Sequence, residues 1–212
     1  MPDQQIRHPL FARFYARIST SMDSAGVGEL RAGLLAGLTG SVLEVAAGNG
    51  LNFQYYPASV TSVLAVEPEP HLRGIAERAA AAAVVPIKVV NGTAEQLPAP
   101  DGSVDAVVAT LMLCSVRDVG TALAEMRRVL RPGGQLIFME HVQGDSAVCR
   151  QVQRLADTIR PALCGGCHAG RDPVTAITAA GFSVTSLTRY RRPETSIPWP
   201  TVPHARGIAV RS

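Results

Sequence analysis

The stretch Ser41-Val-Leu-Glu-Val-Ala-Ala-Gly-Asn-Gly50 decides the fold, because it runs from an apolar strand into a turn of small residues. A second apolar segment, 62–66, ends on Glu67. Small residues let a ligand approach the backbone closely, and an acidic residue about 20 positions further on can bind a ribose diol. These features predict a nucleoside site at the strand ends; the alternative is an ordinary strand-to-helix turn.

The residue that follows the two glycines of the turn separates two classes of nucleoside ligand. A dinucleotide fingerprint requires a small third residue, so that the helix can close over its strand with a pyrophosphate at its N-terminus. Here Gly48 and Gly50 are followed by Leu51, Asn52 and Phe53, which is large. S-adenosylmethionine has no pyrophosphate, so the sequence favours this nucleoside over NAD.

Strand and helix patterns alternate through the chain, which predicts an α/β fold with a doubly wound, mostly parallel, seven-stranded sheet. Two consecutive strands at the C-terminal end have no helix between them, so they must pair antiparallel or lie apart. Asp118 and Asp172 are each expected to cap a helix. Strands are expected at the apolar part of 41–50 and at 62–66, 87–90, 105–109, 135–139, 182–190 and 204–210; helices are expected at 71–83, from 119 to a stop at 132–134, and at 174–181.

Several motifs resemble those of the class I S-adenosylmethionine-dependent methyltransferases, which have a Rossmann-like fold. The resemblance covers nearly the whole chain from Ser41 onward. The stretches 110–116 and 138–142, with Pro203-His204, look most like the membrane-associated thiol methyltransferases of the methyltransferase-like group and their bacterial relatives. The motifs are Val42-Leu-Glu-Val-Ala-Ala-Gly-Asn-Gly50, Glu67-Pro68, Gly92-Thr-Ala-Glu-Gln-Leu-Pro98, Asp101-Gly-Ser-Val-Asp105 and Leu130-Arg-Pro-Gly-Gly134.

The resemblance implies a set of residues that hold S-adenosylmethionine and its product S-adenosylhomocysteine. Glu67 would bind the ribose, and Leu111 would pack under the adenine. Ala46 stands where the family usually has a glycine, and Thr93 stands where an acidic residue often contacts the adenine amino group. A neutral hydroxyl at Thr93 gives a weaker hydrogen bond than a carboxylate. The full implied set is Glu44, Ala46, Gly48, Gly50, Asn52, Glu67, Pro68, Thr93, Ala94, Glu95 and Leu111.

Length and composition predict one domain over residues 1–212, with residues 1–40 as a helical lid or cap. An apolar stripe, formed by Leu10, Phe11, Phe14, Tyr15 and Ile18, fits either packing against the body or a lid over the acceptor. A formal charge of +3 is too small to indicate a nucleic-acid partner. The chain has no long apolar segment, so we expect a cytoplasmic protein with no membrane anchor, acting on a small molecule, and we allow for a homodimer.

The segment Cys164-Gly-Gly-Cys167-His168 has the spacing of a haem attachment site and of half a zinc site. Haem attachment requires export, for which the sequence carries no signal. Zinc needs further ligands, and neither Cys114 nor Cys149 belongs to a second pair in the sequence. We therefore expect no metal and reduced thiols, although the loop can still line the acceptor site.

The expected chemistry is methyl transfer to a small-molecule acceptor, with a thiol favoured. A thiol is already partly ionised at neutral pH, whereas an unactivated hydroxyl requires a strong base or a metal. His141 and His204 are the candidate catalytic residues, as base or as positioning groups; each has a purely structural alternative. Two other functions stay open: an O- or C-methyltransferase of a quinone or natural-product ring, and a non-catalytic S-adenosylmethionine-binding protein.

Overall fold

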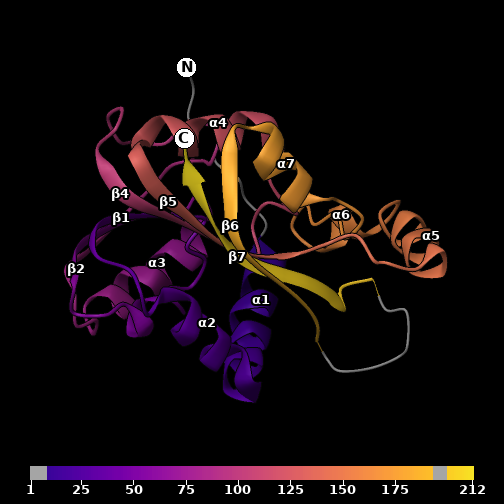
Figure 1. Ribbon diagram of the computed structural model, residues 1–212. Helices are drawn as coiled ribbons and strands as arrows, with labels where there is room; N and C mark the ends of the chain where they lie inside the picture. Colours follow the sequence, from indigo (N-terminus) through magenta and orange to yellow (C-terminus); the bar gives the residue numbers. More distant parts are fainter. Residues whose placement is uncertain (1–8, 193–199) are drawn as a thin grey trace.

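A twisted seven-stranded sheet forms the centre of the molecule (Figure 1). The computed structural model describes residues 9–192 and 200–212. The strand order is β3-β2-β1-β4-β5-β7-β6, and every neighbouring pair is parallel except the two pairs made by β7. The strands are β1 (Gly40–Val45), β2 (Val60–Val66), β3 (Ile87–Val90), β4 (Val104–Thr110), β5 (Leu130–His141), β6 (Phe182–Arg191) and β7 (Pro203–Arg211).

Both faces of the parallel strands are buried, because successive side chains point to opposite sides. Val42 and Val108 pack in one apolar cluster with residues of α2 and α3, while Leu43 and Val107 pack in the other with α4 and α7. Figure 1 shows these two helix layers on opposite sides of the sheet. The helices of the two layers are α2 (Gly28–Leu35), α3 (Pro70–Ala80), α4 (Val119–Val129) and α7 (Pro173–Ala179).

The sequence predictions of fold class and strand positions are confirmed, with small changes at the ends. The Asp118 and Asp172 carboxylates cap α4 and α7, as expected. The helix expected to stop at 132–134 already ends at Val129, because Leu130 adopts extended backbone and begins β5. β7 lies between β5 and β6, so the antiparallel strand is next to the edge of the sheet and not at it.

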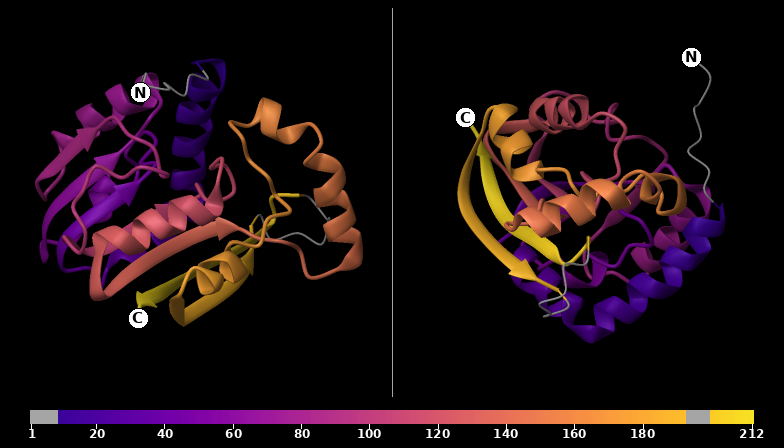
Figure 2. Two further views of the ribbon diagram at one scale, coloured as in Figure 1. Left: turned by 90° about the horizontal axis from the view of Figure 1, so that it is seen from above. Right: turned by 90° about the vertical axis from the view of Figure 1, so that its right-hand side faces the viewer.

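The helices α5 (Ala147–Ala156) and α6 (Arg160–Leu163) were not predicted from the sequence. The signal was present: the Ser146 hydroxyl accepts a hydrogen bond from the Cys149 amide and caps α5. Figure 2 shows this segment standing away from the two helix layers, beyond the end of β5. The residues 193–199, between β6 and β7, lie outside the described residues.

Helix α1 (Pro9–Met22) carries the predicted apolar stripe, and only part of this stripe faces the body. Phe11 and Tyr15 turn toward the body, whereas Leu10, Phe14 and Ile18 are exposed by 82%, 60% and 41%. The residues 23–27 join α1 to α2, and Gly26 interrupts the helical path with a φ of 98°. Among the described residues, no helix combines the length and apolarity required to cross a membrane.

Gln153 of α5 connects three separate loops at one buried point. Its Nε2 donates hydrogen bonds to the carbonyls of Val142, Ala169 and Pro200 at 2.9–3.0 Å, and its Oε1 accepts one from the Gly144 amide. The side chain is fully buried. Buried carbonyls without a donor are costly, so this amide fixes the α5–α6 segment against the sheet.

We expect Gln153→Ala to lower the free energy of unfolding by about 2–4 kcal/mol, because it leaves several buried backbone groups unpaired. Urea titration followed by circular dichroism measures this loss. Gln151→Ala removes the same type of side chain from an exposed position of the same helix and should change stability by less than about 0.5 kcal/mol. Equal losses in the two variants would contradict the assignment.

Candidate active site

The turn after β1 has the backbone that a closely approaching ligand requires. Ala46, Gly48 and Gly50 have φ values of 52°, 60° and 79°. For the two glycines this left-handed conformation is free of strain, whereas at Ala46 it costs about 1 kcal/mol. The Ala46 side chain, noted in the sequence as a departure from the family pattern, therefore occupies a position at which glycine would be favoured.

Glu67 lies directly after β2 and is 4% exposed. Its two carboxylate oxygens accept hydrogen bonds from the amides of Gly48, at 2.7 Å, and Glu69, at 2.9 Å. Burial raises the pKa of Glu67 to about 7. This side chain therefore joins the small-residue turn to the end of β2, which is the position expected for a ribose ligand.

Glu44 and Asn52 also lie together, as part of a buried polar network. The Glu44 carboxylate, 1% exposed, accepts hydrogen bonds from Asn52 Nδ2 at 2.9 Å and from the Tyr56 hydroxyl at 2.6 Å. The Arg31 guanidinium donates to Asn52 Oδ1 at 2.7 Å and is paired with Asp23. The sequence analysis missed Arg31 and Tyr56, because nothing local indicates that they turn toward the strand ends.

The remaining implied cofactor residues follow β2, β3 and β4. Pro68 comes directly after Glu67, and its carbonyl accepts a hydrogen bond from Arg73. The Glu95 carboxylate accepts hydrogen bonds from the amides of Arg117 and Asp118, which ties the segment after β3 to the start of α4. Thr93 forms an isolated bridge with Gln96, Ala94 is buried, and Leu111 has a φ of 56° directly after β4.

Tyr15 places helix α1 over the small-residue turn. A Cβ atom added to Gly48 would lie 3.5 Å from Tyr15 Cε1, so the ring packs directly against the turn. Burial raises the pKa of the Tyr15 hydroxyl. The charge of Arg31 lowers this pKa, and the charge of Glu67 raises it. One turn earlier, Phe11 packs against Gly165. Helix α1 therefore covers the edge of the sheet from the turn after β1 to the loop that follows α6.

Two cysteines and a histidine meet beyond the ends of β4 and β5. The Sγ atoms of Cys114 and Cys167 are 3.5 Å apart, and His141 Nδ1 lies 3.6 Å from the first and 3.9 Å from the second. Both cysteines are buried and His141 is half-buried. The sequence analysis treated Cys164 and Cys167 as a pair, whereas the fold gives Cys167 a different partner, Cys114.

The loop that carries Cys114 is held by a buried carboxylate. Glu140, the residue before His141, accepts hydrogen bonds from the amides of Met112, Leu113 and Cys114. It is fully buried, and burial raises its pKa to about 8. The same strand end thus supplies His141 and positions the cysteine beside it.

Cys167 lies next to a guanidinium group as well as next to Cys114 and His141. The Arg160 guanidinium donates a hydrogen bond from Nη2 to Cys167 Sγ at 3.2 Å. The nearby Cys114 thiol, His141 and Arg160 together lower the pKa of Cys167, whereas the pKa of Cys114 is raised. Cys167 is therefore the more acidic of the two thiols.

The two predicted catalytic histidines are neighbours, although 63 positions separate 141 from 204 in the sequence. His141 and His204 stand opposite each other in the β5–β7 ladder, with ring centroids 4.8 Å apart, and Tyr190 of β6 stacks on His204 at 5.2 Å. His204 Nδ1 lies 2.8 Å from the Val202 carbonyl oxygen. Burial lowers the pKa of His204 to about 4, so the ring is neutral, with Nδ1–H donating and with no donor to Nε2 among the described residues.

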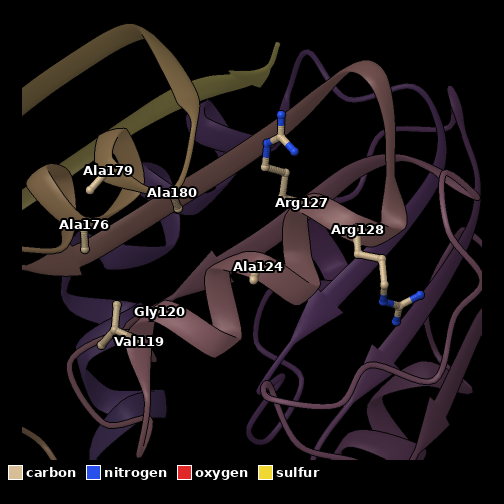
Figure 3. A pocket seen from close by; sticks show the side chains of 8 residues that line it. All are labelled: Val119, Gly120, Ala124, Arg127, Arg128, Ala176, Ala179 and Ala180. Atoms are coloured by element: carbon tan, nitrogen blue, oxygen red, sulfur yellow. The ribbon is translucent and has the colours of Figure 1, made fainter.

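The other histidines do not join this group within the described residues. His71 is exposed on α3, and His168 takes part through its backbone, since its amide donates to the Cys114 carbonyl at 2.7 Å. A hollow of about 610 Å³ lies between α4 and α7. Mainly small side chains and two arginines line it (Figure 3). It lies on a helix face of the sheet and contains none of the site residues named above.

Comparisons with known sequences show which proteins this chain is similar to. Residues 43–138 match the family model described as a methyltransferase domain. Human thiol S-methyltransferase TMT1A is 36% identical over 178 residues, which cover 81% of this chain and 70% of that protein. The ubiquinone/menaquinone biosynthesis C-methyltransferase UbiE of Marinomonas sp. is 41% identical over only 66 residues, which cover 31% of this chain and 26% of that protein.

Solved structures agree on the architecture. A crystal structure of a putative methyltransferase from Bacillus halodurans superposes with a TM-score of 0.71 at 17% identity, covering 85% of this chain and 98% of the other. At this level of identity the likeness concerns the fold alone. It confirms the predicted α/β architecture with its mostly parallel sheet.

Glu44 and Glu67 make the stability of the fold depend on pH. Burial raises the pKa of each to about 7 from the ordinary value of 4.5 for a glutamate. Between pH 4.5 and about pH 7 the folded chain keeps protons that the unfolded chain has released. The stability that is fully present below pH 4.5, the unfolded pKa, is therefore lost as the pH rises through the folded pKa of about 7. We expect the calorimetric unfolding midpoint of the ligand-free chain to fall between about pH 5 and about pH 8.

The Glu67→Gln variant has no ionisable group at this position. Its unfolding midpoint should therefore fall less steeply with rising pH. Glu77→Gln, on the exposed face of α3, is the matched control and should keep the slope of the unmodified chain. If Glu67→Gln leaves the slope unchanged as well, Glu67 does not titrate in this range.

Proposed function

This chain belongs to the S-adenosylmethionine-dependent methyltransferase family that includes thiol S-methyltransferase TMT1A, and on that premise we propose that it methylates the sulfur of a small thiol. It is an enzyme, and S-adenosylmethionine is its methyl donor. The single observation that carries the acceptor proposal is the similarity to thiol methyltransferases over 81% of the chain. The similarity to the quinone C-methyltransferase is confined to about a third of it.

The residues at the ends of β1 and β2 fit the donor. The left-handed turn at Ala46, Gly48 and Gly50 leaves room for a ligand against the backbone, and the Glu67 carboxylate is already held in place by two amides. We propose that Glu67 binds the ribose and that Glu44 and Asn52 line the methionine part. The adenine would lie among Thr93, Ala94, Glu95 and Leu111. When bound, S-adenosylmethionine supplies a methyl group on a positively charged sulfur.

We propose that the acceptor binds beside His141 and His204, at the edge of the sheet where such folds hold ligands. The neutral His204 presents Nε2 as a hydrogen-bond acceptor that can take the proton of a thiol. His141 contacts both cysteines, so we assign it a positioning role beside the acceptor sulfur. Because a thiol is already partly ionised at neutral pH, such modest assistance is enough.

Helix α1 supports the proposal of a lid formed within residues 1–40 of a single domain. Tyr15 packs on the donor turn and Phe11 packs near the cysteine loop, so one helix spans both halves of the reaction site. Excluding water strengthens each electrostatic interaction at the site. We also propose a cytoplasmic location, because all four cysteines are free.

We expect Glu67→Ala to weaken binding of S-adenosylmethionine and S-adenosylhomocysteine by roughly 1.5–3 kcal/mol, through the loss of charged hydrogen bonds to the ribose. Titration calorimetry measures both affinities. Glu77→Ala, an exposed glutamate of α3, should leave them unchanged. Tight binding of NAD by the unmodified chain, or equal affinities in all three proteins, would reject the donor site.

We expect kcat/KM for a small alkyl thiol to rise with pH toward the pKa of the thiol, because the thiolate is the nucleophile. His204→Ala should lower kcat/KM by up to about 10²-fold near neutral pH and by little once the thiol is ionised. Release of S-adenosylhomocysteine, followed across the pH range, provides the measurement. His71→Ala removes an exposed histidine and should match the unmodified enzyme.

Two results would contradict this assignment. A His204→Ala profile parallel to that of the unmodified enzyme would leave His204 with a structural role. Methylation of a phenol or a quinone, with none of any thiol, would replace the acceptor by an oxygen or carbon nucleophile.

A further inference from the structure

Three soft ligand atoms converge where the structure places Cys114, His141 and Cys167. The two Sγ atoms and one imidazole nitrogen of His141 lie within 4.8 Å of one another. The three residues come from the loop after β4, from the end of β5 and from the loop after α6. The sequence argument against zinc required a second cysteine pair, but here the additional ligands come from distant segments.

The spacing of these atoms agrees with that of a metal-binding face. Zinc bonds of about 2.3 Å to sulfur and about 2.0 Å to nitrogen, at tetrahedral angles, place two sulfurs about 3.8 Å apart and a sulfur about 3.6 Å from the nitrogen. The observed distances are 3.5 Å between the Sγ atoms, and 3.6 Å and 3.9 Å from them to His141 Nδ1. An ion could therefore be held with movements of a few tenths of an ångström.

The backbone holds these ligands in place through contacts of its own. The Cys114 amide donates to Glu140, and the Cys114 carbonyl accepts from the His168 amide. Gly166, with a φ of 86°, passes so close to the Ser115 carbonyl that a Cβ there would lie 2.7 Å from the oxygen. The two loops are thus joined tightly, and the cysteines face each other because of it.

The surroundings suit metal-bound thiolates. Arg160 Nη2 donates to Cys167 Sγ at 3.2 Å, and Ser115 Oγ lies 3.4 Å from Cys114 Sγ. Hydrogen bonds of this kind to ligand atoms orient them and tune the metal. Two thiolates also neutralise a divalent ion, so the buried site would carry no net charge from its ligands and the metal.

We propose that Cys114, His141 and Cys167 bind one zinc ion and leave its fourth position open for the thiolate of the acceptor. Two sulfur ligands with one imidazole select zinc over magnesium or calcium. Three protein ligands with an open position are typical of catalytic zinc sites, and the described residues bring no fourth cysteine, histidine or carboxylate into the cluster. A thiol that coordinates a metal loses its proton, here to His204 Nε2, the proton acceptor proposed above, and this deprotonation is the activation that methyl transfer to sulfur requires. The second part of the proposal rests on the proposed thiol methylation.

The first test is the metal content of the full chain. Protein reduced with a phosphine, incubated with zinc and dialysed should retain about one zinc per chain by mass spectrometry of the metal. Cys114→Ser and Cys167→Ser should each weaken zinc binding by more than about 100-fold in competition with a chromogenic chelator, beyond the loss typical of an outer-shell change. Circular dichroism confirms that each variant is folded.

Cys164→Ser is the matched control. It removes a thiol from the same loop but lies outside the cluster, so it should retain the zinc of the unmodified chain. A reduced chain that retains no zinc, or a Cys164→Ser variant that loses as much as Cys167→Ser, would overturn the metal site. His141→Asn should weaken zinc binding too; if it does not, the imidazole is not a ligand.

The second test uses cobalt in place of zinc. The cobalt protein should show thiolate-to-metal charge-transfer absorption, about halved in each cysteine variant because one of two sulfurs is lost. Addition of a small alkyl thiol should strengthen this band, and a phenol of similar size should not. An unchanged spectrum with the thiol overturns the assignment of the fourth position to the acceptor.

Zinc binding and thiol methylation can each fail without the other. Thiol methylation that persists at full rate in a reduced, zinc-free enzyme contradicts the role of zinc in acceptor activation and leaves the proposed function intact. Zinc binding by a chain that methylates no thiol supports the metal site and rejects the thiol as acceptor.

Discussion

Buried carboxylates at the ends of parallel strands hold the candidate active site together. Glu67 after β2 and Glu140 at the end of β5 each accept hydrogen bonds from amides of a neighbouring loop, and Glu44 of β1 holds Asn52 and Tyr56. Burying a carboxyl group is costly unless its oxygens are paired, so each of these residues requires its loop in one conformation. These loops carry the candidate functional groups, and backbone hydrogen bonds such as that from the Leu111 amide to the Met139 carbonyl add to the hold of the carboxylates.

The antiparallel pair at the C-terminal side of the sheet supplies the other half of the site. Because β7 runs against β5, the start of β7 meets the end of β5, and the ladder sets His204 opposite His141. The same register places Tyr190 of β6 beside His204. A fully parallel sheet would bring only carboxyl ends to this edge; the reversed strand adds residues that come late in the chain.

The proposed acceptor site lies beside two cysteines. They belong to two loops that a glycine allows to touch, and an arginine donates a hydrogen bond to one of them. Helix α1 packs against both the loop after α6 and the small-residue turn after β1, so one helix covers the two regions. The shallow hollow between α4 and α7 has no such convergence of polar groups and takes no part in the chemistry described.

The sequence alone determined the order of strands and helices, the small-residue turn and Glu67, because these depend on residues close together in the chain. The caps at Asp118 and Asp172 are local in the same way. Helix α5 was not predicted, although its Ser146 cap and its amphipathic pattern are local features as well. Only the tertiary structure decided that Cys114, His141 and Cys167 meet, since 27 and 26 positions separate them and no periodic pattern links segments so far apart. Their contact follows from strand register and loop packing, which no local stretch of sequence specifies.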